Sequence, residues 1–200
     1  IADKYHNKVY EFGNIVREEI INSNLNDQIN NFDNIKVLVL GGSQAAKVFA
    51  DELPQIFEKL KVSKIPVEVY QQCQKKQNDQ LSNFYKKAEI NHEIFNYTDK
   101  IIDYYSKVNL VITRSGASVL GELVNFKIPF ITIPLPTSAD NHQYKNAEFY
   151  QKKGYGYLLE EKDIKNKLYD LIIKIFNDKS LSSDILVNQR QYSGKDIFKD

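Results

Sequence analysis

The chain has 200 residues, of which 42% are hydrophobic, 27 are basic and 26 are acidic, so its formal net charge is +1. This length and apolar content are enough for a buried core, and the balanced charge excludes the concentrated basic face expected of a nucleic-acid-binding protein. One cysteine and three histidines exclude an internal disulfide and a closed zinc site, and they favour a reducing, cytosolic compartment.

The first 34 residues differ from the rest of the chain. Residues 1–8 are polar rather than signal-like, and no apolar run approaches the roughly 18 to 20 residues that span a bilayer. We therefore predict a soluble protein. Because the sequence contains no methionine and begins at Ile1, we interpret it as a fragment whose start lies upstream. The Asn-rich stretch 22–34 is predicted to be a linker before the main domain.

From residue 35 onward, short β-branched runs alternate with longer amphipathic runs, which predicts βα units and a parallel sheet covered by helices. The apolar runs VLVL and FITI are continuous, as expected of strands buried on both faces. The fold class is therefore predicted to be α/β, with one Rossmann-like domain. The predicted strands are 35–40, 66–71, 93–97, 109–113, 129–133 and 155–159. The predicted helices are 46–60, 79–87, 100–107, 118–126, 141–152 and 163–176.

Three loops that follow predicted strands have unusual compositions. They are residues 41–46 (GGSQAA), 113–117 (TRSGA) and 134–143 (PLPTSADNHQ), and each opens a predicted helix. Ligands of open α/β sheets bind outside the carboxyl ends of the strands. Helix N-termini carry unpaired N–H groups and about half a positive charge, so two small-residue loops at one crevice predict an anion site.

Each small-residue loop also has a purely structural interpretation. GGSQAA matches neither G-x-G-x-x-G nor a P-loop, and it could be a tight turn in which Ser43 caps the next helix. In SGAS, Ser115 could be a cap, while Gly116 allows close approach of the backbone to a ligand. Local composition leaves both alternatives open.

Glu122 follows the second loop at a distance that suits a nucleotide. It lies five residues beyond Ala117, about 7.5 Å along a helix, which is too far for its main task to be complementing the helix dipole. In NAD-binding domains the ribose-binding acid lies on the next strand, about 20 residues on. A glutamate on the helix itself predicts a different nucleotide pose, in which the carboxylate accepts both ribose hydroxyls.

The segment 140–147 (DNHQYKNA) has more hydrogen-bonding side chains than one helix cap requires, and sugar hydroxyls would use them. The alternative is an ordinary polar N-terminus with Asp140 or Asn141 as the cap. A serine–histidine nucleophile is disfavoured because G-x-S-x-G is absent. Without a D-x-D pair for a metal, phosphate charge would be met by amides and arginine.

Taken together and in order, these loops resemble the carboxy-terminal half of the MurG family, bacterial peptidoglycan N-acetylglucosaminyltransferases with a GT-B fold. VLVLGGSQAA (37–46) resembles the family's first strand and loop, and RSGAS…E (114–122) its nucleotide signature. PLPTSADNHQYKNA (134–147) resembles its P-x-P…D-[DN]-H-Q…N-A segment. FGNIVR (12–17) is similar to the GNPVR segment where the amino-terminal domain ends. The resemblance covers nearly the whole chain.

This resemblance implies a set of contacts with a UDP-sugar. Arg17 and Ser43 would contact the phosphates, and the backbone of Ala117, Ser118 and Val119 would hold the pyrophosphate. Glu122 would bind the ribose. His142 and Gln143 would hold hydroxyls of the sugar, and the backbone near Thr98 would bind uracil. Four positions depart from the family pattern. Ala45 replaces a glycine, Ile15 a proline, Val119 a common threonine and Thr98 a frequent apolar residue. At Val119, only the amide remains for the phosphate.

The implied function is the donor-binding part of an inverting transferase. It would move N-acetylglucosamine from UDP-GlcNAc to lipid I, undecaprenyl-pyrophosphoryl-MurNAc-pentapeptide, to make lipid II. Residues 1–34 would be the end of the amino-terminal domain and the linker, and 35–200 the donor domain. The acceptor site, catalytic base and membrane contact would lie in the missing amino-terminal domain.

The resemblance implies no cofactor and no metal. It also implies a peripheral position on the cytoplasmic side of the bacterial inner membrane for the intact enzyme, and no transfer by this chain alone. Two alternatives stay open: a subunit of a split GT-B transferase that recruits a separate acceptor-domain protein, and a nucleotide-sugar-binding module without catalysis.

Overall fold

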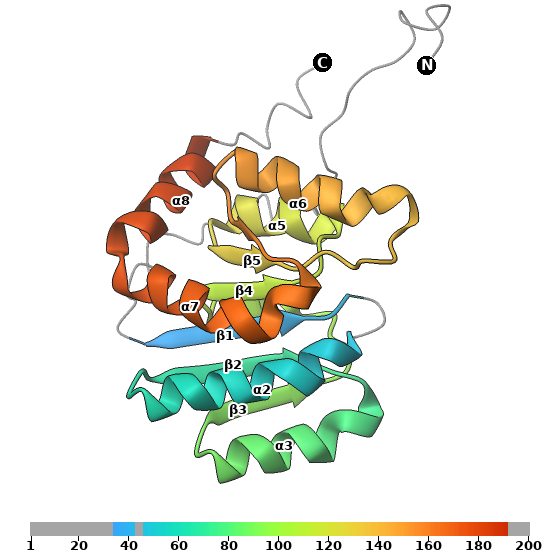
Figure 1. Cartoon of the computed structure of the whole chain (residues 1–200), viewed down its shortest axis with the longest axis vertical. Coiled ribbons are helices and arrows are strands. Elements are labelled where there is room, and N and C mark those ends of the chain that lie inside the picture. Colours follow the sequence, from blue (N-terminus) through green and yellow to red (C-terminus); the bar gives the residue numbers. More distant parts are fainter. Residues whose placement is uncertain (1–33, 43–45, 192–200) are drawn as a thin grey trace, which may run out of the picture.

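A single parallel sheet organises the chain, as the computed structural model in Figure 1 shows for residues 34–42 and 46–191, the part that the structure describes. The strand order is β3-β2-β1-β4-β5-β6, and every neighbouring pair is parallel. The predicted fold class is confirmed. The strands are β1 (Ile35–Leu40), β2 (Val67–Gln72), β3 (Asn91–Phe95), β4 (Leu110–Thr113), β5 (Phe130–Thr132) and β6 (Tyr157–Leu158).

Helices cover both faces of this sheet. One hydrophobic core lies under α2, α3 and α7, and a second lies under α4, α5 and α6. The α-helices are α2 (Lys47–Val62), α3 (Asn78–Lys87), α4 (Ile101–Tyr105), α5 (Ala117–Phe126), α6 (His142–Lys152), α7 (Ile164–Asn177) and α8 (Lys179–Gln191). Short 3-10 turns are η3 (Lys75–Gln77), η4 (Ala139–Asn141) and η5 (Glu161–Asp163).

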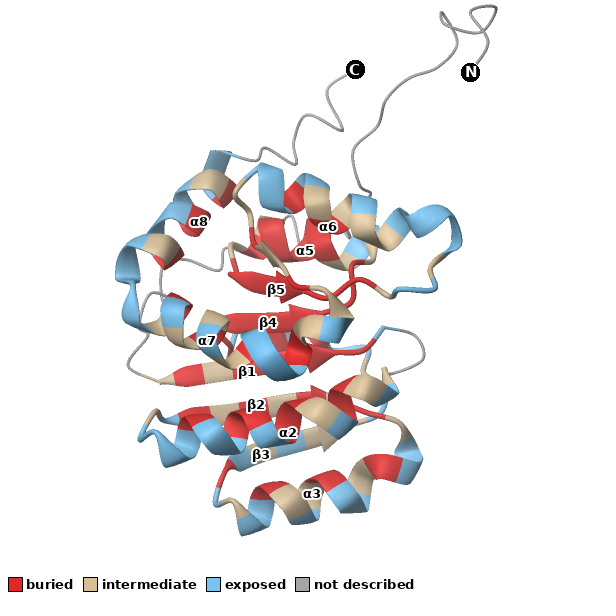
Figure 2. Ribbon diagram, in the orientation of Figure 1, coloured by how far each residue is buried: buried red, intermediate tan, exposed pale blue. Residues whose placement is uncertain are grey.

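The alternation of side chains along β1 explains its continuous apolar sequence. Val37 and Val39 point into one core, whereas Leu38 and Leu40 point into the other. Successive residues of a strand face opposite sides, so a strand with helices on both faces needs apolar residues at every position. Figure 2 shows β1, β4 and β5 largely buried and β3, at the edge, largely exposed or half-buried.

The predicted elements are confirmed with small shifts at their ends. The first strand matches at both ends, but the third begins and ends two residues earlier than predicted, at Asn91–Phe95. The helix predicted at 100–107 spans only Ile101–Tyr105. Helix α8 was not predicted, because its buried stripe is half polar. The buried residues of α8 are Ser182, Ile185, Leu186 and Gln189.

The strand order places a topological switch point between β1 and β4. These two strands are neighbours and end in register, with Leu40 opposite Thr113. The chain then leaves β1 toward α2 on one face and β4 toward α5 on the other. Such diverging connections leave a crevice at the carboxyl edge, where open α/β sheets bind ligands.

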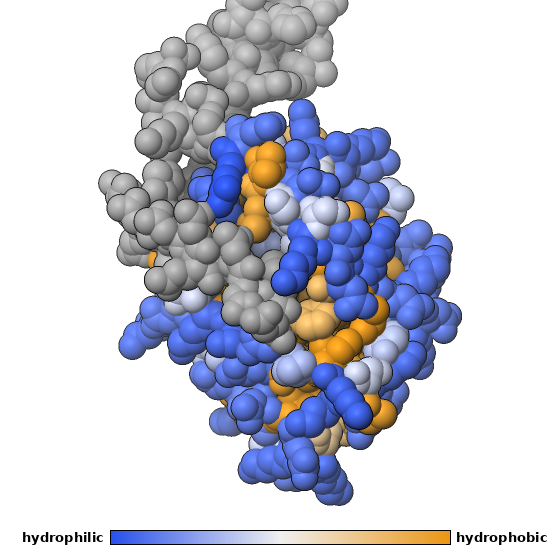
Figure 3. Space-filling view, turned by 90° about the vertical axis from the view of Figure 1, so that its left-hand side faces the viewer, coloured by the Kyte–Doolittle hydropathy of each residue, from blue (hydrophilic) through white to orange (hydrophobic). Residues whose placement is uncertain are grey.

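Figure 3 shows the side of the molecule at the amino edge of the sheet, where hydrophobic surface lies in strips between hydrophilic side chains. A pocket between Ile35, Leu110 and Ile172 has a volume of about 10 Å³, about enough for one water molecule. The carboxyl edge is therefore the place to look for a ligand.

Two glycines on this scaffold provide a test of packing. A Cβ at Gly156, just before β6, would lie 2.5 Å from a ring carbon of the buried Phe130. We expect Gly156→Ala to lower the free energy of unfolding by about 1–3 kcal/mol, since the ring has to move within a packed core. The measurement is chemical denaturation.

Gly116→Ala is the matched control for Gly156→Ala. A Cβ at Gly116 would meet its nearest neighbour, Val119, at 3.7 Å, an ordinary contact. We expect a change within about 0.5 kcal/mol. Equal effects of the two substitutions would contradict this account of the core.

Candidate functional site

A pocket of about 610 Å³ opens at the carboxyl edge of the sheet. Pockets that bind small molecules typically measure about 300–1,000 Å³. Its walls come from the ends of β1 to β4, the loops that follow them, helix α4, the first two turns of α5 and the first turn of α6. The lining residues are Leu40, Gly42, Gln72, Phe95, Asn96, Tyr97, Thr98, Ile101, Tyr105, Thr113, Arg114, Gly116, Val119, Glu122 and Gln143.

Four of the predicted site residues line this one pocket, although they lie in three separate segments of the chain. They are Thr98, Val119, Glu122 and Gln143. Thr98 Oγ1 also accepts a hydrogen bond from the amide of Lys100 at 2.9 Å, which holds the turn after β3. The structure therefore brings together side chains that sequence reasoning could only place on separate loops.

The other predicted residues lie beside the pocket or outside the described part of the chain. Ala117 and Ser118 are exposed in the first turn of α5. His142 is exposed and does not line the pocket, and its Nδ1 lies 2.8 Å from the carbonyl oxygen of Ala139. Arg17 and Ser43 are outside the described residues.

Helix α5 begins at the edge of the pocket. Its N-cap is Gly116, in an extended conformation, which has no side chain with which to cap the helix. A helix N-terminus in this state presents backbone N–H groups and the positive end of the helix dipole to the pocket. The arrangement suits an anion such as a phosphate.

Ser115 is not the cap of α5, so that local interpretation was wrong. Its Oγ lies 2.7 Å from Thr132 Oγ1 on β5, and its carbonyl accepts a hydrogen bond of 3.0 Å from Asn146 Nδ2 on α6. Ser115 is completely buried. Its side chain joins the loop after β4 to strand β5.

Of the caps proposed for the other two helices, one differs from the structure and one agrees with it in position. The N-cap of α2 is Ala46, not Ser43. The N-cap of α6 is Asn141, as one alternative predicted, but it adopts a left-handed conformation and makes no side-chain cap hydrogen bond. Asp140 before it is also left-handed, with φ of 47°. Helix capping therefore does not account for the polar composition of these loops.

Glu122 is a buried carboxylate in the pocket wall. Only 8% of it is exposed, and its Oε2 accepts a hydrogen bond of 3.0 Å from the hydroxyl of Tyr105. This bond orients the carboxylate on the second turn of α5. A carboxylate held in this way can accept hydrogen bonds from ligand hydroxyls.

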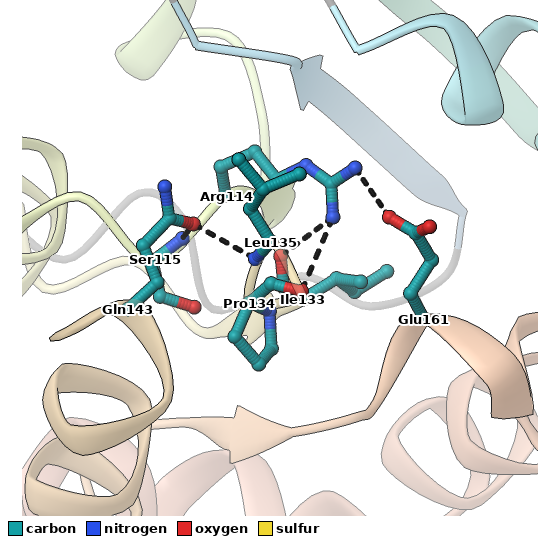
Figure 4. A network of polar contacts seen from close by, with 7 residues as sticks. All are labelled: Arg114, Ser115, Ile133, Pro134, Leu135, Gln143 and Glu161. Carbon is teal, nitrogen blue, oxygen red and sulfur yellow. Dashed lines mark hydrogen bonds and ion pairs between the residues drawn. The ribbon is translucent and has the colours of Figure 1, made fainter. Parts of the chain in front are cut away.

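Gln143 links the loops after β4 and β5. Its Oε1 accepts hydrogen bonds from the amide of Ser115 at 3.3 Å and from the amide of Leu135 at 3.0 Å, as Figure 4 shows. Two backbone donors at one atom identify that atom as the oxygen of the side-chain amide. The Nε2 of Gln143, a donor only, is therefore the group it can offer to a ligand in the pocket.

Arg114 is buried and serves the scaffold of the site. Its Nη1 donates to the carbonyls of Ile133 and Pro134 at 3.2 and 3.3 Å, and its Nη2 lies 2.5 Å from Glu161 Oε2 (Figure 4). The guanidinium also lies 4.8 Å from the ring centre of Phe49 on α2. These contacts use the planar donor fork that lysine lacks. The side chain of Arg114 thus binds carbonyls and a carboxylate of the protein itself.

An aromatic stack supports the wall after β3. Phe95 lines the pocket and stacks on Tyr104 of α4, with ring centres 4.6 Å apart. The hydroxyl of Tyr104 donates to Glu93 at 2.6 Å. Burial has the largest effect on the pKa of Tyr104, and this hydrogen bond adds to it, so the pKa is raised to about 12. The tyrosine therefore remains a neutral donor throughout the physiological pH range.

Sequence reasoning missed several residues of the site, among them Tyr97, and also the partner of Arg114. Tyr97 lines the pocket with 83% of its surface exposed, and Glu161 lies 47 positions from its partner Arg114. The place of Tyr97, directly after a strand, is a signal that could have identified it. Nothing in the local pattern around Glu161 could have indicated its partner.

Two properties of the described residues concern metals and membranes. Within 34–42 and 46–191, no group of three or more histidine, cysteine, aspartate or glutamate residues is placed to hold a metal ion. Among the same residues, no helix combines the length and apolar character needed to cross a bilayer.

A six-stranded parallel sheet with a pocket at its switch point defines an α/β domain of the Rossmann-like class. Residues 36–192 match the glycosyltransferase family 28 C-terminal domain, and the chain belongs to this family.

Relatives in sequence are named as transferases. The chain is 37% identical over 177 residues to the UDP-N-acetylglucosamine--N-acetylmuramyl-(pentapeptide) pyrophosphoryl-undecaprenol N-acetylglucosamine transferase of Pelagibacter ubique, covering 88% of this chain and 49% of the relative. It is 34% identical over 204 residues to the transferase of the same name from Rickettsia felis, covering 96% and 57%. The chain thus spans about half the length of these curated relatives.

Solved structures share the fold. The crystal structure of Acinetobacter baumannii MurG superposes with a TM-score of 0.70 at 23% identity, covering 80% of this chain and 46% of that one. The structure of S. aureus MnaA with UDP gives a TM-score of 0.58 at 11% identity, covering 85% and 46%. The fold is that of one half of a GT-B glycosyltransferase.

The Arg114 network leads to a prediction on stability. We expect Arg114→Lys to lower the free energy of unfolding by about 2 kcal/mol, because an ammonium cannot reach two carbonyls and Glu161 together. Lys162→Gln, which breaks the exposed ion pair with Glu160, should change it by less than about 0.5 kcal/mol. Denaturant titration compares the two, and similar losses would argue against a scaffolding role for Arg114.

Proposed function

We propose that this chain binds the UDP-GlcNAc donor of a peptidoglycan glycosyltransferase. The observation that carries the proposal is the pocket at the β1–β4 switch point, which gathers a helix N-terminus, a buried carboxylate and a fixed glutamine amide. Those three groups suit a diphosphate, a ribose and a sugar. Membership of glycosyltransferase family 28 supports the same assignment.

The start of α5 is the proposed pyrophosphate site. Ala117, Ser118 and Val119 form the first turn, and its N-cap is a glycine. Backbone amides in this position would stabilise the negative charge that develops on departing UDP, a preorganised electrostatic effect that contributes a few kcal/mol in many enzymes. Arg17 and Ser43 remain proposed phosphate contacts.

Nucleoside recognition is assigned to the two adjoining walls. Glu122, oriented by Tyr105, would accept both ribose hydroxyls. The backbone near Thr98 would bind uracil, and the exposed ring of Tyr97 beside it would cover the face of the base. Together these contacts would select a uridine nucleotide.

The start of α6 is the proposed sugar site. Gln143 offers a donor, because its oxygen is occupied by two backbone amides. The sugar must therefore present an acceptor there, such as a hydroxyl oxygen or the N-acetyl carbonyl. His142 would contribute Nε2, since its Nδ1 is close to the Ala139 carbonyl.

The reaction proposed for the whole protein is inverting transfer of N-acetylglucosamine from UDP-GlcNAc to lipid I, which produces lipid II. Residues 1–34 would end the preceding domain and link it to the donor domain, 35–200. The other half of the enzyme would supply the catalytic base and peripheral contact with the cytoplasmic side of the inner membrane. The substrate names of the relatives from Pelagibacter and Rickettsia support this proposal.

Thermal unfolding with UDP tests the proposal. At a hundredfold excess over Kd, bound UDP should add about 2.7 kcal/mol to the free energy of unfolding. Glu122→Gln should weaken UDP binding at least about tenfold, because the ribose loses a charged acceptor. Glu148→Gln, on the outside of α6, is the matched control. Stabilisation by NAD but not by UDP would exclude the proposed function.

Gln143→Glu separates the scaffolding and binding roles of this residue. The new carboxylate can still accept from the amides of Ser115 and Leu135, so the melting temperature should be preserved. Its second oxygen faces the sugar as an acceptor, and we expect UDP-GlcNAc affinity to fall about tenfold or more while UDP affinity falls less. Calorimetry with both ligands measures the difference, and an unchanged UDP-GlcNAc affinity would refute the assigned polarity.

A further inference from the structure

The side chain of Gln72, the last residue of β2, connects two walls of the pocket at the carboxyl edge. Its Oε1 accepts a hydrogen bond of 3.1 Å from the amide of Gly41, and its Nε2 donates one of 3.3 Å to the carbonyl of Asn96. Gly41 follows β1 and Asn96 follows β3, and these two strands lie on either side of β2 (Figure 1). One side-chain amide therefore joins the loops of two strands to the strand between them.

This side chain continues the connection between β1 and β2 beyond their backbone ladder. The pairing of the two strands runs as far as Val39 opposite Gln71. Gly41 lies one residue past the end of β1, and the next residue of β2, Gln72, reaches its amide with a side-chain oxygen. Because one partner of Gln72 is a backbone donor and the other a backbone acceptor, the orientation of its amide is fixed.

Gly41 is also held by the helix that follows it. Its carbonyl accepts a hydrogen bond of 3.1 Å from the amide of Ala46, the N-cap of α2. The next residue, Gly42, lines the pocket, and a Cβ there would lie 3.9 Å from the Cβ of Arg114, two residues before the N-cap of α5. The start of the loop after β1 is therefore fixed beside the start of α5, the proposed diphosphate site.

The turn after β3 is attached to the same end of β2. The side chain of Asn96 donates from Nδ2 to the carbonyl of Cys73 at 2.9 Å and to Oδ1 of Asn78 at 2.7 Å. The two residues that follow Asn96 form the proposed uracil site and line the pocket. The base-binding turn and the loop after β1 are thus connected through Gln72.

A nucleoside diphosphate has to contact both of these walls at once. A ligand loses affinity when binding must first order the loops that receive it, so a site of two parts benefits from a spacing that is fixed beforehand. Uridine, which lacks the diphosphate, would contact the base-binding turn and Glu122 but would not extend to the loop after β1. The two ligands should therefore depend on the connection to different extents.

We propose that Gln72 is a positioning residue, which sets the distance between the base-binding turn and the loop beside the diphosphate so that one ligand can occupy both. The inference rests on the proposed function. Gln72 has the same task for the loops after β1 and β3 that Gln143 has for the loops after β4 and β5. The two glutamines would together fix the four loops around the donor.

Binding of UDP and of uridine to Gln72→Met tests this inference. Methionine has a similar length but provides neither the acceptor for Gly41 nor the donor for Asn96. We expect UDP affinity to fall about tenfold or more and uridine affinity to fall less than about threefold, as measured by NMR titration of the 15N-labelled chain. Gln80→Met, an exposed position of α3 outside the pocket, is the matched control and should change neither affinity.

Amide hydrogen exchange at Gly41 gives a second readout, in the absence of ligand. In Gln72→Met this amide loses its acceptor and should exchange at least about fivefold faster, while amides inside β1 keep their rates. Gln72→Asn, whose amide is one methylene too short to reach both partners, should reproduce both effects and serves if Gln72→Met fails to fold.

The outcomes separate this inference from the function on which it rests. Equal losses of UDP and uridine affinity, an unchanged UDP affinity, or an unchanged exchange rate at Gly41 would overturn the role of Gln72 and leave the donor function intact. Absence of UDP binding by the unsubstituted chain would refute the proposed function and this inference together.

Discussion

A buried guanidinium holds together the carboxyl edge on which the site is built. Arg114 joins the end of β4 to the carbonyls that follow β5, to Glu161 after β6 and to Phe49 of α2. Removing such a group from water is costly unless every donor finds a partner, so these segments have little freedom to move independently. The position of the α5 N-terminus, which follows Arg114 closely in the chain, depends on this arrangement.

Residues of the loops at the carboxyl edge divide their tasks in a way that composition alone does not reveal. In RSGAS…E, Arg114 and Ser115 hold the scaffold, small residues form the start of the helix, and Glu122 faces the pocket. Gln143 has both tasks: its oxygen binds two amides of the scaffold, and its side chain lines the pocket. Loss of ligand binding on substitution therefore does not by itself identify a ligand contact.

Much of the fold could be predicted because its signals are local. The run 35–40 has the continuous apolar pattern of a strand buried on both faces, and β1 has those same bounds. Helix α8 escaped prediction because Ser182 and Gln189 are buried on its inner face. Gln189 satisfies its amide nitrogen with the carbonyls of Ile128 and Tyr155. A polar residue can be buried when distant carbonyls receive its hydrogen bonds, and such partners are not visible in a local pattern.

The amino-acid sequence by itself determined the βα alternation, the three loops at the carboxyl edge and the family resemblance, since each depends on residues close together in the chain. Tertiary structure alone decided that Thr98, Val119, Glu122 and Gln143 share a pocket, that Ser115 is not a cap, and that Arg114 is paired with Glu161. The physical reason is that strand order and loop closure set distances between residues far apart in sequence, and side-chain partners follow from those distances. The pocket between Pro134, Tyr144 and Glu160 exists for the same reason, because the segments after β5 and β6 meet only in the folded sheet.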